Sequence, residues 1–302
     1  MDLLREAENN TPNKPPSLKV KLAALFSNIR GFNLLLLITA QFLAAIFIFS
    51  EGIPWYYVLK DINLWIIVFS TICVVSAGYI INNFYDFEAD LINRPYKTSL
   101  ENQIEQRTKL RLYFLLNFAG FATAFLISWK AALFFAFYIF LIWLYSHKLK
   151  SMPILGFVSV AILQLLPFFV IFVYYGNFST IIFAHASFLF FLILMKELVK
   201  GLENQAGDEI QDRNSLSIVY GDRFSKLLYS LLTLLILNPV YYLLKFEPVG
   251  KMTYYFYGSY LILIFSNILL YRANSKASFL LVHNILRVLL FIGVFSIILI
   301  RY

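Results

Sequence analysis

The sequence predicts an all-α, polytopic membrane protein with about nine transmembrane helices, and two observations support this fold class. Of the 302 residues, 60% are hydrophobic and only 14% are charged, with a mean hydropathy of +0.73, whereas a soluble domain carries about 25% charged residues. The apolar residues also lie in long continuous runs. Strands of a membrane barrel would instead alternate over roughly 10 residues, so a bundle of helices is expected.

Nine segments of the chain are long and apolar enough to cross a membrane. A hydrocarbon core about 30 Å thick needs roughly 20 apolar residues in a helix. The segments that meet this requirement are residues 32–50, 62–82, 110–129, 131–146, 153–175, 178–197, 227–246, 253–271 and 279–300.

The N-terminal segment differs from the rest of the chain. Residues 1–29 are predicted to form a polar, partly flexible tail, and residues 30–302 a single transmembrane domain. No cleavable signal peptide is expected, because the tail has no early apolar core. Residues 17–30 are expected to form either a short amphipathic helix at the membrane surface or a simple linker to the first span.

The composition also excludes other classes of protein. The hydrophobic content is too high for a disordered chain, and Cys73, the single cysteine, cannot form an internal disulfide. A net charge of +8 is compatible with nucleic acid or with a membrane surface. Because the charges flank apolar runs, we expect membrane lipids as neighbours and no nucleic-acid partner.

The Lys and Arg residues are concentrated on one side of the predicted bundle. With a cytoplasmic N-terminus, the cations on the opposite side are Lys60, Lys130, Lys245, Lys251 and Arg301. The positive-inside rule therefore predicts that the N-terminus is cytoplasmic and the C-terminus outside, in a bacterial inner membrane. Most acidic residues fall in two long cytoplasmic segments, residues 82–109 and 196–226, where function is expected.

The first acidic segment contains Asn82, Asp86 and Asp90, which follow the second span at intervals of four residues. On a helix this spacing places three oxygen-bearing side chains on one face, about 6 Å apart. Such oxygens suit Mg²⁺, which completes its coordination with water and phosphate oxygens. Arg94 and Lys97 supply cations for a diphosphate. Solvation of a helix end is the simpler explanation, but acids that directly follow an apolar span are commonly functional.

Two stretches of the chain resemble the UbiA-type intramembrane prenyltransferases. Residues 82–95 are similar to that family's first aspartate-rich motif, Asn-x-x-x-Asp-x-x-x-Asp followed by Asn-Arg-Pro. Residues 196–209 are similar to its second motif, Arg-Glu-x-x-Lys-Asp-x-Glu-Asp-x-x-Gly-Asp. Here Gly201 and Asn204 replace two aspartates of that pattern, and Asp208 is the aspartate retained.

The resemblance implies a nine-helix, Mg²⁺-dependent transferase that moves a prenyl group from a polyprenyl diphosphate to a hydrophobic acceptor, in quinone or lipid biosynthesis. It implies that Asp86, Asp90 and Asp208 are catalytic. The implied metal ligands are Asn82, Asp86, Asp90, Asn204 and Asp208. The implied diphosphate-binding residues are Arg94, Lys97, Lys148, Lys150 and Lys200. The implied substrate-binding residues are Arg30, Asn33, Tyr145 and Ser146.

Several alternatives stay open at this point. Glu197, Glu203 or Asp212 would compensate for the missing aspartates in an active enzyme, whereas a diverged, non-catalytic protein would bind or carry a prenyl lipid. The family's acceptors include aromatic acids, haem and glycerol-phosphate lipids, and the Asn-Arg-Pro sequence is closer to the aromatic-acid and glycerol-lipid branches. His283 and Arg287 lie one turn apart inside the last span, where they can line a cavity.

Overall fold

A computed structural model describes residues 17–50, 52–246 and 249–301, and helices make up the regular structure of these residues. The α-helices are α2 (Leu18–Asn28), α3 (Gly31–Ala44), α4 (Trp55–Lys60), α5 (Ile62–Tyr85), α6 (Phe87–Asn93), α7 (Pro95–Glu101), α8 (Gln106–Phe125), α9 (Trp129–His147), α10 (Pro153–Tyr175), α11 (Thr180–Glu203), α12 (Gln205–Ile210), α13 (Leu216–Leu235), α14 (Leu237–Phe246), α15 (Thr253–Arg272) and α16 (Lys276–Ser296). Short π- and 3₁₀-helices complete the list: η1 (Ala45–Phe49), η2 (Leu149–Ser151), η3 (Gly250–Met252) and η4 (Ile297–Arg301). The predicted all-α fold class is confirmed.

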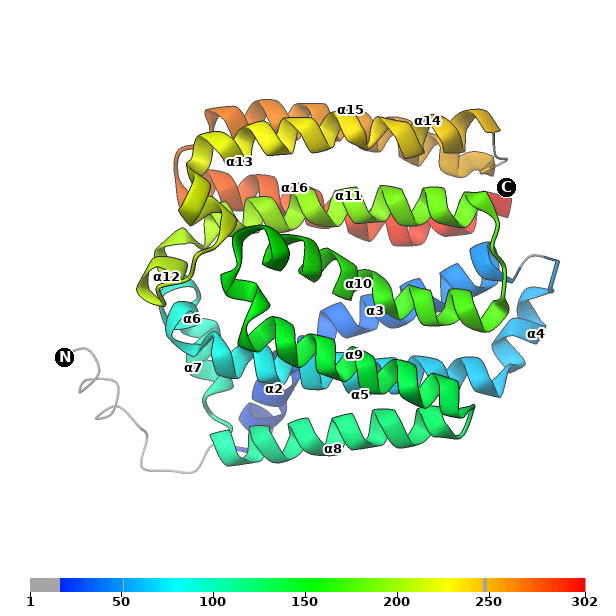
Figure 1. Cartoon of the computed structure of the whole chain (residues 1–302), viewed down its shortest axis with the longest axis horizontal. Coiled ribbons are helices and arrows are strands. Elements are labelled where there is room, and N and C mark those ends of the chain that lie inside the picture. Colours follow the sequence, from blue (N-terminus) through cyan, green and yellow to red (C-terminus); the bar gives the residue numbers. More distant parts are fainter. Residues whose placement is uncertain (1–16, 51, 247–248, 302) are drawn as a thin grey trace.

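The long helices lie side by side along a common direction (Figure 1). The short helices α6, α7 and α12 gather at the left-hand end of this view, and the chain finishes at the right-hand end. Within the described residues, eight helical stretches are long and apolar enough to cross a membrane. The predicted span 110–129 is the one without a counterpart among these eight stretches. It corresponds to α8, which packs against α5 and α9 and carries Arg107, Lys109 and Arg111 near its start.

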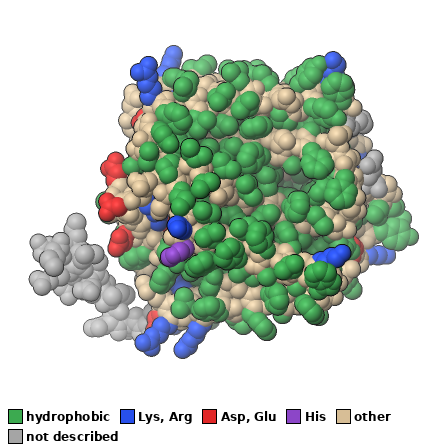
Figure 2. Space-filling model, viewed as in Figure 1, with side chains coloured by type: hydrophobic (Ala, Val, Ile, Leu, Met, Phe, Trp, Pro, Cys, Tyr) green, Lys and Arg blue, Asp and Glu red, His purple; other side chains and the backbone are tan. Residues whose placement is uncertain are grey.

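Hydrophobic side chains cover most of the visible face of the bundle, and acidic side chains lie at its left-hand edge (Figure 2). Large apolar residues such as Phe118, Leu126 and Tyr254 are more than two-thirds exposed, as expected for a surface in contact with lipid tails. Two buried apolar clusters hold the helices together, one centred on α11 and its neighbours α13 to α16, the other on α3, α5, α9 and α10.

Several helices extend beyond their predicted spans at the end that carries the acidic segments. Helix α5 continues to Tyr85, α11 continues to Glu203, and α13 begins at Leu216. The expected functional segments therefore begin on helices that are anchored in the bundle, which restricts the movement of their side chains.

Residues 18–28 form helix α2, so the helical alternative for this part of the N-terminal segment is confirmed. Asn28 is 1% exposed and donates to the carbonyl oxygen of Glu101 at 3.2 Å, while its own carbonyl accepts from Asn83 at 3.1 Å. These contacts fix α2 against α7 and α5. Residues 1–16 lie outside the described residues, and the domain boundary at residue 30 stays a prediction.

Candidate functional site

A cavity of about 1180 Å³ lies inside the bundle. Its walls come chiefly from α3, α5, α9, α10, α11 and α16, and α6 and α12 contribute at one end. That end is polar, whereas residues such as Phe49, Phe172 and Phe188 line the opposite end. A ligand with a charged head and a long apolar chain fits this division.

The Asn82, Asp86 and Asp90 series spans the junction of α5 and α6. Asp86 lies between the two helices with φ −95° and ψ 3°. The backbone N–H of Asp86 still donates to the carbonyl of Asn82 at 2.9 Å, and that of Asp90 to the carbonyl of Asp86 at 2.8 Å. This hydrogen-bonded spacing continues through the bend, and all three side chains line the cavity.

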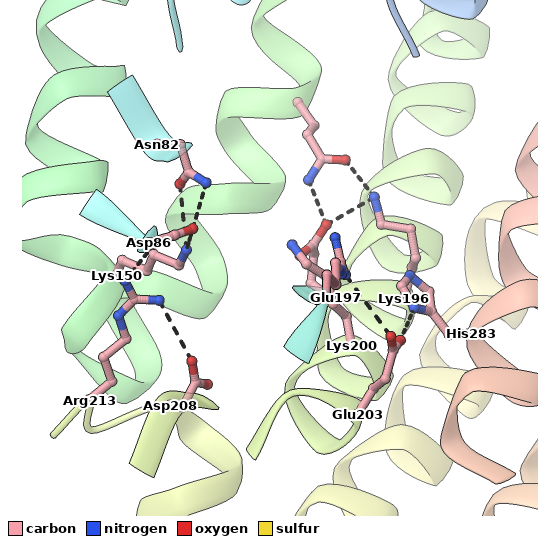
Figure 3. A network of polar contacts seen from close by, with 12 residues as sticks. Asn82, Asp86, Lys150, Lys196, Glu197, Lys200, Glu203, Asp208, Arg213 and His283 are labelled. Carbon is pink, nitrogen blue, oxygen red and sulfur yellow. Dashed lines mark hydrogen bonds and ion pairs between the residues drawn. The ribbon is translucent and has the colours of Figure 1, made fainter. Parts of the chain in front are cut away.

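Asp86 has three side-chain partners and is 5% exposed. Its carboxylate accepts a hydrogen bond from the Asn82 amide at 2.6 Å and forms ion pairs with Lys150 and Arg213 (Figure 3). Burial raises the pKa of Asp86, but the charges of Lys150 and Arg213 outweigh this and hold it at about 2. Burial also lowers the pKa of Lys150, and the charge of Asp86 opposes that shift.

Arg213 joins the two acidic segments, although it is not among the site residues expected from the sequence. Its guanidinium pairs with Asp86 and lies 3.7 Å from the carboxylate of Asp208, and it also donates to the carbonyl of Tyr85 at 3.2 Å. Its own backbone N–H donates to the carbonyl of Asp208 at 2.9 Å. Arg213 is 9% exposed. The only sequence feature that could have indicated Arg213 as a site residue is its position five residues after Asp208.

The second acidic segment reaches the cavity through Asn204 and Asp208. The backbone carbonyl of Asn204 accepts a hydrogen bond from Asn93 at 3.2 Å, but its amide oxygen Oδ1 is buried without a hydrogen-bond partner. Burial raises the pKa of Asp208, and the neighbouring Lys150 opposes that shift. The two replacements therefore leave an amide oxygen and one carboxylate, while Gly201 contributes no ligand atom.

Helices α6 and α12 touch at Gly207. A Cβ atom at this position would lie 2.1 Å from the Asn93 side chain and 2.7 Å from the carbonyl oxygen of Ala89. These distances are far below van der Waals contact, so only glycine allows the two helices to approach so closely. Gly207 thereby sets how near the two acidic segments come to each other.

Glu197 stands at the wall of the cavity one turn before Gly201. Its carboxylate pairs with Lys196 at 2.9 Å and with Lys200 at 3.0 Å, and it accepts a hydrogen bond from Gln164 at 2.9 Å. Both of its oxygens are therefore engaged by neighbouring donors. Its role in this arrangement is to hold Lys196 and Lys200 in place beside the cavity.

The remaining predicted residues divide into two groups. Residues that line the cavity are Arg30, Asn33, Arg94, Tyr145, Ser146, Lys150 and Lys200. Lys97 and Lys148 are not among the lining residues, because Lys97 pairs with Glu101 at 3.0 Å and Lys148 is exposed at the end of α9. Glu203 bonds to His283, Asp212 is exposed, and neither is among the residues that line the cavity.

The donor atoms at the polar end suit a magnesium ion. No group of three or more His, Cys, Asp or Glu side chains is arranged to hold a metal among the described residues. The cavity instead offers carboxylates from Asp86, Asp90 and Asp208 together with the unpartnered amide oxygen of Asn204. Mg²⁺ commonly takes one or two carboxylates and fills its other positions with water and phosphate oxygens. A phosphate-bearing ligand would therefore complete the site.

Comparison with known proteins supports the family suggested by the two motifs. A sequence model of the UbiA prenyltransferase family matches residues 36–286. The digeranylgeranylglyceryl phosphate synthase of Saccharolobus solfataricus is 30% identical over 218 residues, which are 68% of this chain and 74% of the relative. The enzyme of the same name from Methanobrevibacter smithii is 29% identical over 209 residues, 66% of this chain and 70% of the relative.

Solved structures share the fold. A UbiA homolog from Archaeoglobus fulgidus bound to GPP and Mg²⁺ superposes with a TM-score of 0.67 at 15% identity, covering 91% of this chain and 99% of that one. A digeranylgeranylglyceryl phosphate synthase structure gives a TM-score of 0.66 at 21% identity, covering 92% and 97% of the two chains. The predicted enzyme class, a prenyltransferase, is thus confirmed, and this multi-pass membrane protein belongs to the UbiA prenyltransferase family.

Proposed function

We propose that this protein transfers a prenyl group from a prenyl diphosphate to a hydroxyl of a glycerol-lipid acceptor, in a Mg²⁺-dependent reaction inside the membrane. The observation that carries this proposal is the meeting of the two acidic segments, through Arg213, at the polar end of a cavity that is otherwise apolar. Two relatives named digeranylgeranylglyceryl phosphate synthase support the glycerol-lipid acceptor over an aromatic acid.

The reaction breaks the allylic carbon–oxygen bond, and the electron pair of that bond leaves with the diphosphate. An acceptor hydroxyl oxygen then forms the new carbon–oxygen bond and loses its proton. Bound Mg²⁺, held by Asn82, Asp86, Asp90, Asn204 and Asp208, would supply positive charge to the departing diphosphate.

The protein's own cations would share this task. Lys150, Lys200 and Arg213 line the polar end and would hold diphosphate oxygens through charge-assisted hydrogen bonds, which strengthen as negative charge develops. The apolar walls would keep water away from the allylic cation, and the aromatic face of Tyr145, which also lines the cavity, would stabilise its positive charge.

The positive-inside distribution favours a cytoplasmic location for the polar end. The helices α6, α7 and α12 follow predicted cytoplasmic ends of the spans, and the acidic side chains gather at that edge (Figure 2). A bacterial inner membrane stays a prediction, because the relatives that carry the acceptor assignment come from Methanobrevibacter smithii and Saccharolobus solfataricus.

The test is a transfer assay with the purified full chain in lipid vesicles, labelled geranylgeranyl diphosphate, Mg²⁺ and a panel of acceptors. We expect a labelled lipid whose mass equals geranylgeranylglyceryl phosphate plus one geranylgeranyl group minus one hydrogen. Asp86→Asn should abolish the product, whereas Glu88→Gln, a change at a neighbouring exposed acid, should not. Transfer to an aromatic acid alone, or no transfer to any acceptor, would overturn the proposal.

A further inference from the structure

Three arginines line the cavity on the side formed by α3 and α16. We call Arg30, Arg94 and Arg287 the arginine cluster. Arg30 precedes α3, Arg94 lies between α6 and α7, and Arg287 lies on α16. They are close enough for the charges of Arg94 and Arg30 to repel that of Arg287. Three segments far apart in the sequence therefore bring like charges to one place.

The positive charge of the arginine cluster exceeds the negative charge that faces it. Glu203 lies 4.0 Å from Arg94, and it is also bonded to His283 (Figure 3). Arg287 is exposed, and its hydrogen bond among the described residues is a 3.5 Å contact with Asn284. A charge on a membrane-spanning helix that forms no salt bridge with an acidic side chain of the described residues is costly. An anionic ligand would remove this cost.

Arg30 is held ready for such a ligand. Its backbone adopts the left-handed conformation with φ 51° and ψ 53°, which is strained for a residue other than glycine and is often found at ligand sites. Its guanidinium lies 4.9 Å from the ring centre of Tyr79, and its Nε is buried without a hydrogen-bond partner. Arg30 thus has a fixed position and an unused donor.

The surroundings of the arginine cluster are apolar and open to the side. Phe32 and Leu35 of α3 are 79% and 55% exposed, and Val288 and Phe291 of α16 are 57% and 52% exposed, yet all four also line the cavity. The cavity therefore reaches the lipid-facing surface between α3 and α16, directly beside Arg30 and Arg287. The occupant of this opening must combine an anionic head with a hydrocarbon chain.

We propose that Arg30 and Arg287 bind the phosphate headgroup of the glycerol-lipid acceptor, with its chain against α3 and α16, and that Arg94 separates this phosphate from the donor's diphosphate. This subsite deepens the proposed function and rests on it for the identity of the acceptor. The donor diphosphate has its own cations, Lys150, Lys200 and Arg213, around the acidic segments. The arginine cluster is thus available to a second anion.

The primary test measures binding, so it does not depend on turnover. The purified full chain in neutral lipid vesicles is titrated with geranylgeranylglyceryl phosphate, with the dephosphorylated geranylgeranylglycerol, and with glycerol phosphate. We expect the phosphorylated lipid to bind at least about 10-fold more tightly than either of the others, since each charge-assisted hydrogen bond contributes about a factor of 10. Equal binding of the two lipids would overturn the proposal, and equal binding of glycerol phosphate would show a site for free phosphate instead.

Variants separate the subsite from the rest of the site. Arg287→Gln and Arg30→Gln should each weaken binding of the phosphorylated lipid about 10-fold and leave binding of the dephosphorylated lipid unchanged. The affinity of Arg287→Lys for the phosphorylated lipid should lie between those of wild type and Arg287→Gln, because lysine keeps the charge but cannot donate two parallel hydrogen bonds. The matched control is Arg272→Gln, an exposed arginine at the end of α15 that does not line the cavity.

Kinetics distinguish failure of this inference from failure of the proposed function. In an active protein, Arg287→Gln should raise the KM for the phosphorylated acceptor about 10-fold and leave the donor KM and kcat nearly unchanged. The acceptor subsite would be refuted, even if transfer is observed, by an equal rise in KM for the phosphorylated and dephosphorylated acceptors or by a rise in KM for the donor alone. Preferential binding of the phosphorylated lipid without any transfer would support the subsite and reject only the enzymatic proposal.

Discussion

Arg213→Gln is expected to destabilise the protein because this residue joins the two acidic segments. The pKa of Asp86 is lowered from 3.8 to about 2, and one pKa unit corresponds to about 1.4 kcal/mol, so the ion pairs with Lys150 and Arg213 stabilise the protein by about 2 kcal/mol net of the opposing cost of burying Asp86. Assigning half to Arg213 and adding about 1 kcal/mol for its hydrogen bond to the Tyr85 carbonyl gives a cost of about 2 kcal/mol. The midpoint of thermal unfolding should fall by about 3 °C, given an unfolding entropy of about 2.1 cal/mol/K per residue.

The pH dependence of this effect has a defined sign. Because the folded pKa of Asp86 is depressed, its stabilisation is present above the unfolded value of 3.8 and is lost as the pH falls toward 2. The difference between wild type and Arg213→Gln should therefore be constant from pH 5 to pH 7 and shrink below about pH 4. This difference is measured by thermal unfolding in detergent with EDTA, monitored by circular dichroism at each pH.

The control for this experiment is Arg223→Gln, which removes an exposed arginine of α13 that does not line the cavity. It should unfold within about 1 °C of wild type, since exposed charges contribute little. The reasoning is refuted if Arg213→Gln matches Arg223→Gln at pH 7, or if its deficit is as large at pH 2.5 as at pH 7.

Three further predictions concern the metal and its ligands. Chelation with EDTA should abolish prenyl transfer, and excess Mg²⁺ should restore it; transfer that persists in EDTA would contradict the donor set described above. Asp90→Ala should lower kcat/KM at least about 100-fold without changing the unfolding midpoint, because Asp90 is only partly buried, and an equal loss in Glu88→Ala would argue against a specific role. Asn204→Asp should lower the Mg²⁺ concentration for half-maximal activity several-fold, because it places a carboxylate where an amide oxygen has no partner; a Mg²⁺ titration with Asn102→Asp as the control tests this.

The one-turn spacing of the first acidic motif is predictable from the sequence because its geometry is local. Asn82, Asp86 and Asp90 follow one another at one-turn spacing, and the backbone hydrogen bonds preserve this spacing through the bend at Asp86. The long apolar runs likewise predict the spanning helices, because each run satisfies its own backbone hydrogen bonds. In both cases the relevant contacts lie within a few residues of each other along the chain.

Contacts between distant segments were not predictable in the same way. Arg213 reaches Asp86 across 127 positions in the sequence, and its placement depends on the turn after α12, where Asp212 has φ 49°. Lys97 illustrates the opposite case, because it lies close to the first motif in sequence but pairs with Glu101. The sequence shows that cations lie near the acidic motifs along the chain, but the packing of α12 and α13 decides which of these cations reaches the cavity.

The contact at Gly207 has a consequence for how substrates exchange. Since α6 and α12 already touch through backbone atoms before any ligand arrives, the spacing of their acidic side chains is set by folding, and the enzyme spends little binding energy on drawing them together. The passage of long hydrocarbon chains into and out of the bundle would then contribute to the rate of turnover, so the rate should depend on the fluidity of the surrounding bilayer.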